Sequence, residues 1–221
     1  NVRVTAITVD EGIAGYRSET VPKVSELCRE LGVEHAVVSF EEVAGLSLDM
    51  MVGRTDAREA CTYCGVFRRR CLNITARELG VDVLALGHNL DDMAQSVLMN
   101  ITRGDVERLA RLGPHAHAQP GLVPRIMPLR TVPEKETYLY ALLSGLPFSD
   151  AECPYAVHAL RNEYRQIIDG MEHRHPGTRH AILGSYDRLR PLMREGFPQA
   201  KLLECTCGEP TLNERCMACE M

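Results

Sequence analysis

Tryptophan is absent from the 221-residue sequence, and aromatic residues make up only 5% of it. Long apolar runs are absent as well, because none approaches the roughly 20 residues that a membrane helix needs. The first residues also lack the basic, apolar and small-residue order of a secretory signal. These absences argue against a membrane partner and favour a cytoplasmic protein. With 45% hydrophobic residues, the chain can still bury a core as one domain with a small appendage.

Positive charge is also in deficit, since the net charge is −5 at pH 7, but it is unevenly distributed. Residues 54–80 carry six arginines against three acids, and residues 161–194 carry seven arginines against four acids. Two interpretations stay open. These arginines form solvated helix faces, or they form a surface that follows the phosphates of a nucleic acid, for which the planar guanidinium is suited.

Strands and helices are predicted to alternate in the first half of the chain. Apolar, β-branched stretches at 2–10, 35–40 and 81–87 have the pattern of buried strands. Helical periodicity covers 19–31 and 56–79, and a third helix is predicted to open at the two aspartates that follow the last strand. This order predicts an α/β fold with a parallel sheet covered on both faces. Ligands are expected beyond the carboxyl ends of its strands.

The second half begins with a break in periodicity. Residues 104–135 hold five prolines in their last part and are expected to form an extended surface connection. Helices are predicted again at 134–144 and 154–171, and the turn between them presents Cys153 directly before a proline. We expect one catalytic domain over residues 1–200 and a separate small unit over residues 201–221.

The C-terminal unit is too poor in apolar residues to fold without a covalent or metal link. Its four cysteines come in two pairs, Cys205 with Cys207 and Cys216 with Cys219. Four thiolates suit a tetrahedral zinc ion, and metal binding would supply the folding free energy. The alternative is a frayed tail with free thiols. We predict a structural Zn²⁺ site.

A second cysteine pair, Cys61 and Cys64, stands directly before an arginine triplet and has no nearby partner pair. A third thiol would have to come from afar, and Cys153 is the candidate, whereas Cys28 and Cys71 fit the packed faces of helices. Three thiolates suit an iron–sulfur cluster with one open iron. A redox dithiol, a persulfide carrier and plain core cysteines stay open as alternatives.

Two adjacent carboxylates, Asp91 and Asp92, follow the third predicted strand and open a helix. One of them is expected to cap that helix, since carboxylates stabilise helix N-termini. The other is then free for Mg²⁺ or for acid–base chemistry, and His88 adds a titratable group at the same strand end.

Several motifs together resemble one known family, the tRNA 2-thiouridine synthetases of the archaeal and eukaryotic type. They are VDEGIAGYR, CTYCGVFRRRCLN, ALGHNLDDMAQSVLMN, PGLVPRIMPLR, ECPYA, and the terminal CGEPT with CMAC. The similarity runs nearly from end to end. It implies an ATP-pyrophosphatase (PP-loop) α/β domain with a helical tRNA-binding portion, followed by a C-terminal zinc finger.

The resemblance also assigns residues. It implies that Cys61, Cys64 and Cys153 hold a 4Fe-4S cluster, that Asp92 is a catalytic aspartate and that Arg68 is a basic catalytic residue. The residues expected to line ATP and its magnesium are Asp10, Gly12, Ile13, Gly87, His88 and Asp91. The Ser-Gly-Gly-x-Asp-Ser-type phosphate loop of the family does not occur in these 221 residues. We expect it upstream of Asn1, with a further zinc finger.

The implied activity is sulfur transfer to a tRNA uridine, most simply at the wobble position. ATP would adenylate the uridine C2 oxygen, and the cluster would then supply sulfur to C2. The sulfur donor is expected to be sulfide or a ubiquitin-like sulfur carrier protein, and the protein is expected to be a homodimer. Cluster-free persulfide chemistry, another nucleotide-activating ligase and a non-catalytic RNA-binding module stay open as alternatives.

Overall fold

The first two strands of the chain pair in parallel. The computed structural model describes residues 2–115, 119–198 and 201–221. Strand β1 (Thr5–Asp10) pairs with β2 (Glu34–Ser39), and helix α1 (Arg17–Glu30) connects them. The register places Asp10 beside Ser39, so both strands end at the same edge. Ser39 then caps α2 (Phe40–Ala44), and Ser47 caps α3 (Leu48–Val52).

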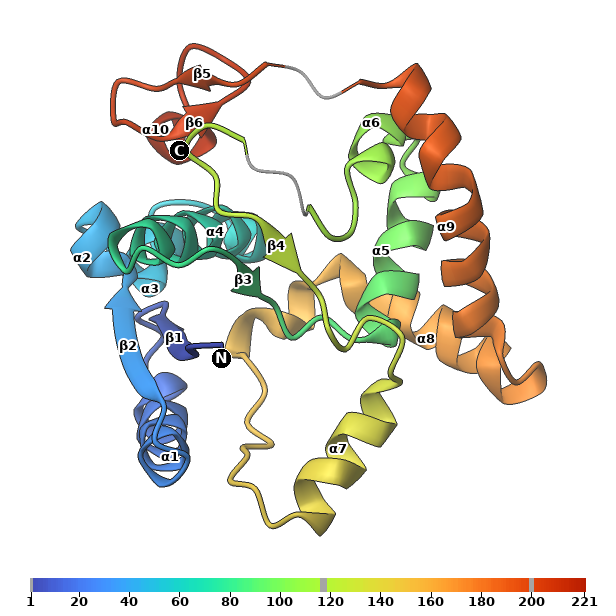
Figure 1. Ribbon diagram of the computed structural model, residues 1–221, viewed down its shortest axis with the longest axis horizontal. Coiled ribbons are helices and arrows are strands. Elements are labelled where there is room, and N and C mark those ends of the chain that lie inside the picture. Colours follow the sequence, from blue (N-terminus) through green and yellow to red (C-terminus); the bar gives the residue numbers. More distant parts are fainter. Residues whose placement is uncertain (1, 116–118, 199–200) are drawn as a thin grey trace.

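Helix α4 (Ala60–Glu78) packs across this strand pair, after a short 3-10 turn η1 (Ala57–Glu59). Its apolar face supplies Phe67 and Cys71 to a core that also holds Phe40 and Leu48, and the two phenylalanine rings lie 5.8 Å apart between centroids. Cys71 is fully buried and Cys28 of α1 is nearly so, which confirms that both are packing residues. Figure 1 shows α4 lying between the β1–β2 pair and the C-terminal unit, and α4 contacts both.

The third expected strand is shorter than predicted and pairs elsewhere. Strand β3 (Leu84–Ala85) pairs in parallel with β4 (Arg125–Ile126), and within the described residues this pair is separate from β1 and β2. β4 lies inside the stretch that we expected to be an extended connection. Apolar contacts explain the difference, because Val123 packs with Leu84 and Ala76 and so brings the segment against β3. The parallel α/β class is confirmed, although the expected single sheet is two short pairs.

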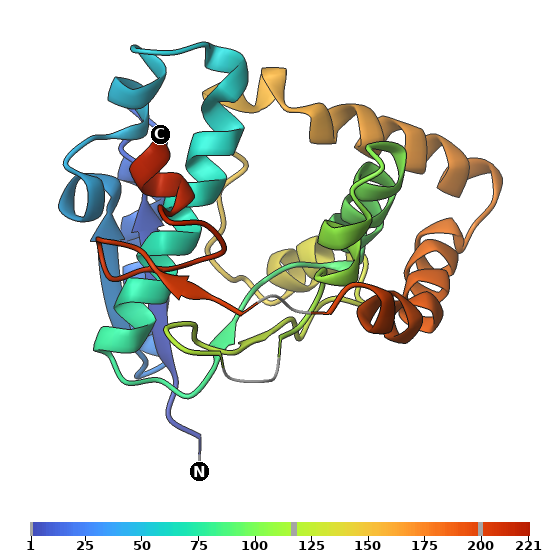
Figure 2. The ribbon, with the colours of Figure 1, turned by 90° about the horizontal axis from the view of Figure 1, so that it is seen from above.

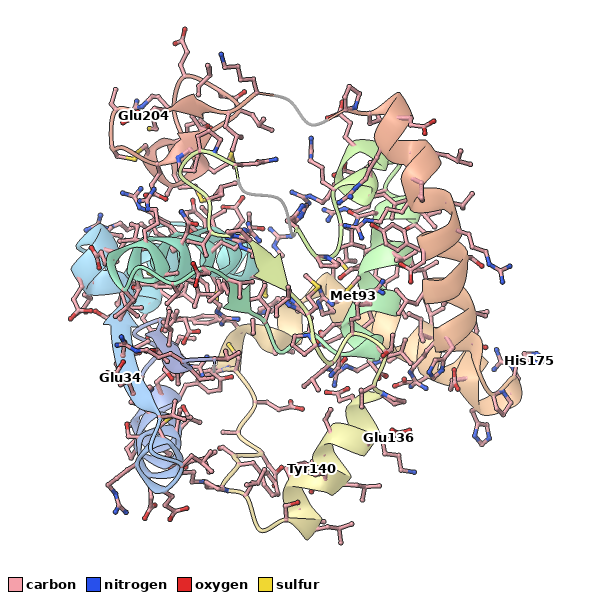
Figure 3. The ribbon with its side chains drawn as sticks, in the orientation of Figure 1. Glu34, Met93, Glu136, Tyr140, His175 and Glu204 are labelled. Atoms are coloured by element: carbon pink, nitrogen blue, oxygen red, sulfur yellow. The ribbon has the colours of Figure 1, made fainter. Side chains whose placement is uncertain are left out.

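A second group of helices stands beside the first (Figure 2). They are α5 (Leu90–Thr102), α6 (Val106–Ala110), α7 (Glu134–Leu143), α8 (Leu160–Arg174) and α9 (Thr178–Gly196). The 3-10 turn η2 (Pro154–His158), directly before α8, contacts η1 and α4 of the first group. Met93 of α5 lies in the core of the second group with Leu183 and Tyr186 of α9 (Figure 3). Helix α7 is different, since none of its residues is buried and Tyr140 projects into solvent (Figure 3). Helix α9 was not predicted from the sequence.

The C-terminal unit contains β5 (Leu203–Glu204), β6 (Pro210–Thr211) and α10 (Met217–Glu220). The turn between the antiparallel strands β5 and β6 holds Cys205 and Cys207. Cys216 is the N-cap residue of α10 and Cys219 lies within that helix, which contacts α4. The boundary that we expected at residue 200 lies outside the described residues. Among the described residues, no helix combines the length and the apolar character needed to cross a membrane.

Candidate functional site

Glu11 is the centre of a buried charge cluster at the end of β1. Its side chain is inaccessible to solvent, and its carboxylate binds Arg17 at 2.6 Å (Nε to Oε2) and Arg68 at 2.6 Å (Nη2 to Oε1). Burial by itself would raise the pKa of Glu11, but the hydrogen bond from Arg17 and the charges of Arg68 and Arg17 outweigh it. The net result is a lowered pKa. The carboxylate is therefore ionised at neutral pH.

Arg68 links the charges around Glu11 to the thiols that are predicted to bind an iron–sulfur cluster. Its Nη2 lies 3.2 Å from Cys64 Sγ, one helical turn earlier on α4. Cys61 stands on the same face of that helix and is exposed, whereas Cys64 is half-buried. Burial raises the pKa of Cys64 to about 11, although the charge of Arg68 acts in the opposite direction. An unliganded Cys64 is thus a neutral thiol, and a metal must displace its proton in order to bind.

The third thiol, Cys153, reaches the same place from the turn before η2. The structure packs η2 against η1 and α4, and Cys153 shares an apolar environment with Cys64. Cys153 also lies near enough to the other two thiols for its charge to contribute to the raised pKa of Cys61 and of Cys64. Three sulfur donors from two distant segments, one of them exposed, fit a cluster that keeps one iron open to a ligand.

The loop after β1 is fixed by Gly12. Its backbone N–H donates to Asp10 Oδ1 at 2.9 Å, and its φ of +68° is a conformation that favours glycine. A Cβ at this position would lie 2.5 Å from the Cβ of Ser47. Ile13 is 5% exposed and packs in the core. The proposed contacts of Asp10, Gly12 and Ile13 with a nucleotide stay predictions.

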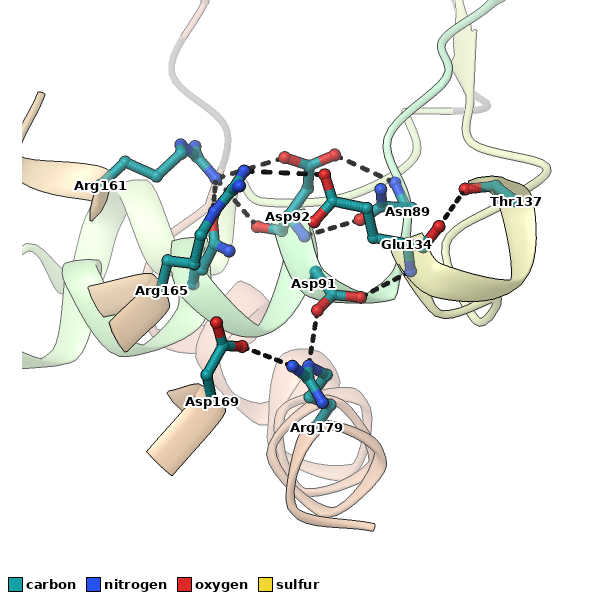
Figure 4. Close-up of polar contacts among 10 residues, drawn as sticks. Asn89, Asp91, Asp92, Glu134, Thr137, Arg161, Arg165, Asp169 and Arg179 are labelled. Carbon is teal, nitrogen blue, oxygen red and sulfur yellow. Dashed lines mark hydrogen bonds and ion pairs between the residues drawn. The ribbon is translucent and has the colours of Figure 1, made fainter. Parts of the chain in front are cut away.

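Asp92 shares a capping box with Asn89 at the start of α5. Asn89 Oδ1 accepts from the Asp92 backbone N–H at 2.9 Å, and the Asn89 N–H donates to Asp92 Oδ2 at 3.2 Å (Figure 4). Arg161 of α8 pairs with the other carboxylate oxygen at 3.6 Å. This carboxylate is one-third exposed. Asp92 is therefore oriented from two sides while it keeps access to solvent.

His88 and Gly87 lie just before this capping box, at the exposed end of β3. Desolvation lowers the pKa of His88, and the charges of Arg161, Arg125 and Arg68 add to the effect, while Asp92 opposes it. The side chain itself is accessible, so neighbouring protein atoms remove only part of its water. The imidazole is therefore neutral at pH 7, when it can accept a proton. Nucleotide binding by His88 and Gly87 stays a prediction.

Asp91 points away from Asp92, into the helical group. It is 7% exposed, pairs with Arg179 of α9 at 2.5 Å, and accepts from the Glu134 backbone N–H at 2.7 Å (Figure 4). Both of its oxygens are thus held by the protein, and they tie α5 to α7 and α9. The contacts of Asp91 are structural, so its assignment to the nucleotide has no support from this geometry and stays a prediction.

The C-terminal cysteines form a compact tetrad. The Sγ atoms of Cys205, Cys207, Cys216 and Cys219 all lie within 4.8 Å of one another, and those of Cys207 and Cys216 are 3.6 Å apart. A tetrahedral zinc with bonds of about 2.3 Å needs sulfur separations of about 3.8 Å. Backbone N–H groups of Cys207 and Cys216 lower the pKa of Cys205 to about 6. The tetrad fits the predicted zinc ion, whose identity stays a prediction.

Sequence reasoning missed two acids that hold these sites. Glu11 was visible only as part of the Asp-Glu-Gly turn, and Glu209 only as part of the CGEPT motif. Glu209 is 7% exposed; it pairs with Arg77 of α4 and accepts from Asn73 Nδ2 at 3.3 Å. A glutamate beside a glycine in a loop reads as solvated, so the only available signal was the excess of arginines on the 56–79 helix.

Comparisons with known proteins show which family the chain resembles. Residues 1–170 match the family model described as PP-loop domain. The whole chain is 40% identical to the tRNA 2-thiolation protein NcsA of Haloferax volcanii and covers 72% of that protein. It is 32% identical to a probable sulfurtransferase of Methanocaldococcus jannaschii and 33% identical to the cytoplasmic tRNA 2-thiolation protein 1 of Caenorhabditis elegans. Of those two proteins it spans 65% and 57%, over 99% and 96% of its own length.

A solved structure has the same fold as this chain. The U34-tRNA thiolase NcsA from Methanococcus maripaludis with its 4Fe-4S cluster superposes with a TM-score of 0.82 at 38% sequence identity. The match covers 99% of this chain and 69% of that one. The family model, the sequence relatives and the solved structure agree with one another on the family. The chain belongs to the tRNA 2-thiolation protein family, and it carries the PP-loop domain of that family.

Proposed function

We propose that the protein replaces the C2 oxygen of a tRNA uridine with sulfur in an ATP-dependent reaction, at the wobble position. The observation that carries this proposal is that Cys64 and Cys153 pack against the same core, with Arg68 beside Cys64 and Cys61 one turn earlier on α4, in a chain of this family. The chain spans about two thirds of the relatives it matches, and the activity proposed is that of the whole protein.

The chemistry requires activation before substitution, because the C2 oxygen of uridine is a poor leaving group. Attack of this oxygen on the α-phosphate of ATP releases pyrophosphate and leaves the oxygen bonded to AMP. Sulfur then attacks C2, and AMP departs with the oxygen. A 4Fe-4S cluster on the three thiols would supply an iron that is free to bind the sulfur.

The residues at the strand ends have complementary tasks in this reaction. The guanidinium of Arg68 places positive charge beside the thiols, where phosphate and sulfur carry negative charge. Asp92 is oriented by Asn89 and Arg161 and can hold magnesium or a proton, and the neutral imidazole of His88 can accept one. Arg69 of α4, which lies near the further positive charges of Arg125 and Arg108, suits the phosphates of tRNA.

Other parts of the proposal concern partners and location. We expect Mg²⁺ to accompany ATP, and Zn²⁺ to occupy the cysteine tetrad. The sulfur donor is expected to be sulfide or a ubiquitin-like carrier protein, and the protein is expected to act as a homodimer in the cytoplasm. The cytoplasmic location follows the name of the Caenorhabditis elegans relative. The metal ions, the sulfur donor and the dimer go beyond what the names of the relatives say.

The test is sulfur transfer by the full-length protein purified without oxygen. It is incubated with a tRNA transcript, ATP, magnesium and sulfide, and 2-thiouridine is measured by retardation in a mercury-containing gel. We expect about four irons per chain, thiolation that depends on ATP, and loss of both iron and thiolation in Cys153→Ala. Cys28→Ala, a buried cysteine elsewhere, is the control and should keep both.

Two results would contradict the proposal. Thiolation with sulfide by a colourless, iron-free protein would mean that sulfide attacks the activated C2 directly, without a cluster. If such a protein thiolates only with a donor that is already a persulfide, the sulfur passes through one of these thiols by exchange. A protein that binds tRNA with a steep salt dependence but neither consumes ATP nor thiolates it would be a binding module.

A further inference from the structure

Glu11 carries a charge in a place where charge is costly. Its side chain has no exposure to solvent, and transfer of a lone carboxylate into such a site would cost far more than the protein's stability allows. Two guanidinium groups offset that cost. Arg17 occupies Oε2 through Nε at 2.6 Å and Oε1 through Nη2 at 2.8 Å, so it grips the carboxylate from one side. The remaining approach to Oε1 is taken by Arg68.

The contact of Arg68 uses a single nitrogen for two purposes. Nη2 lies 2.6 Å from Glu11 Oε1 and 3.2 Å from Cys64 Sγ. A guanidinium nitrogen of this type bears two hydrogens at a fixed planar angle. When one N–H points at the carboxylate, the other is directed at the sulfur. The carboxylate therefore determines which way the second hydrogen faces.

Arg68 would not hold this position by itself. Its side chain is 45% exposed and has several rotatable bonds, so a free arginine there would sample solvent. Arg17 is 23% exposed and stacks over the ring of Tyr16 at 4.8 Å from the centroid, so it is the better-fixed partner. Tyr16 thus helps to fix Arg17, Arg17 holds the carboxylate of Glu11, and that carboxylate holds Arg68.

We propose that Glu11 is a positioning residue for the thiol site, and that it holds Arg68 so that an N–H···S hydrogen bond to Cys64 persists when that sulfur binds iron. This inference rests on the proposed function, because it assumes a cluster on the three thiols. Hydrogen bonds to cysteine sulfur withdraw negative charge from a cluster and raise its reduction potential. Glu11 touches neither substrate nor metal and acts through Arg68.

The experiment compares variants of the full-length, oxygen-free holoprotein by iron content, by resonance Raman bands of the iron–cysteine bonds, and by turnover. Glu11→Gln keeps the shape of the side chain and removes its charge. We expect full iron content, shifted iron–cysteine bands, and a turnover number lowered by about 10- to 100-fold with the KM for tRNA unchanged. Arg68→Gln should shift the same bands in the same direction and lower the reduction potential.

A double variant separates positioning from independent effects. If Glu11 acts only through Arg68, then Glu11→Gln combined with Arg68→Gln should match Arg68→Gln alone in bands and rate. Arg29→Gln removes one positive charge from the exposed last turn of α1 and serves as the control. It should leave the iron–cysteine bands unchanged.

Some outcomes overturn the inference. Wild-type bands and turnover in Glu11→Gln would mean that the carboxylate is structural only. If that variant does not fold, Glu11→Asp keeps the charge but shortens the reach by one methylene, and unchanged bands in it would overturn the inference as well. A wild-type protein that holds the cluster but never thiolates tRNA defeats the proposed function, while the bands still decide the role of Glu11. A wild-type protein without iron defeats both.

Discussion

Two cysteine sites contact the same helix, and they are built differently. At one end of α4, three thiols gather beside Arg68, and Cys61 is exposed. Further along, Arg70 faces the tetrad, with its Nη1 at 3.8 Å from Cys216 Sγ and 3.9 Å from Cys219 Sγ. Four close sulfurs complete the coordination of one ion, whereas three leave a position for a ligand. Under the proposed function, the number and spacing of the thiols would distinguish a structural centre from a reactive one.

The largest expected effect concerns the role of each centre in folding. Cys216→Ser should release zinc and unfold residues 201–221, because structural zinc supplies about 10 kcal/mol or more of apparent folding free energy in small domains. Limited proteolysis and zinc content measure this. Cys153→Ser is the matched control at the other centre. It should lose iron and keep both its zinc and its resistance to protease.

Equal proteolytic sensitivity of the two serine variants would contradict the expected difference between the two cysteine sites. In that case the three-thiol site would also be a folding element. Resistance of Cys216→Ser would instead mean that contacts with α4 hold the C-terminal unit in place without the metal.

A smaller effect is expected at Gly12, which shapes the loop that presents Glu11. Gly12→Ala should lower the free energy of unfolding by about 3 kcal/mol, because a Cβ at φ +68° is strained and would lie 2.5 Å from Ser47 Cβ. Gly15→Ala is the control, since its φ is +73° but no atom lies within 4 Å of the added Cβ. Urea unfolding measures both. Equal losses would show that backbone strain alone is responsible.

At the tetrad, the corresponding test is the buried acid that anchors it. Glu209→Gln should cost about 2 kcal/mol, because it leaves the guanidinium of Arg77 without its charged partner. Glu204→Gln, an exposed glutamate on β5 of the same unit (Figure 3), should stay within about 0.5 kcal/mol of the wild type. Urea unfolding again gives the comparison. A neutral Glu209→Gln would mean that the metal, not the ion pair, docks the C-terminal unit.

The sequence allowed both cysteine sites to be predicted but not the groups that position them. Residue spacing identifies thiols, because cysteine is rare and its pairs have few uses. It does not reveal that Glu11 is buried, since burial depends on Arg68, which lies 57 positions away. The sequence pattern likewise did not distinguish the role of Asp91 from that of Asp92. Their roles differ because Arg179 comes from α9, a helix that went unpredicted with Gly184 and Pro191 inside it.

The smallest effect is expected at His88, where neighbouring charges and burial set the pKa of the imidazole. The lowered pKa of His88 means that, as the pH falls below about 6.5, the unfolded chain takes up a proton before the folded protein does. Stability therefore declines from that pH downwards until the folded-state pKa is passed, and it is independent of His88 above that range. Asp92→Asn should lower this pKa further because it removes a favourable negative charge, and Arg161→Gln should raise it because it removes a positive one. NMR titration of the imidazole C–H signals measures all three proteins. Shifts in the same direction for both variants would show that desolvation, rather than these two charges, controls His88.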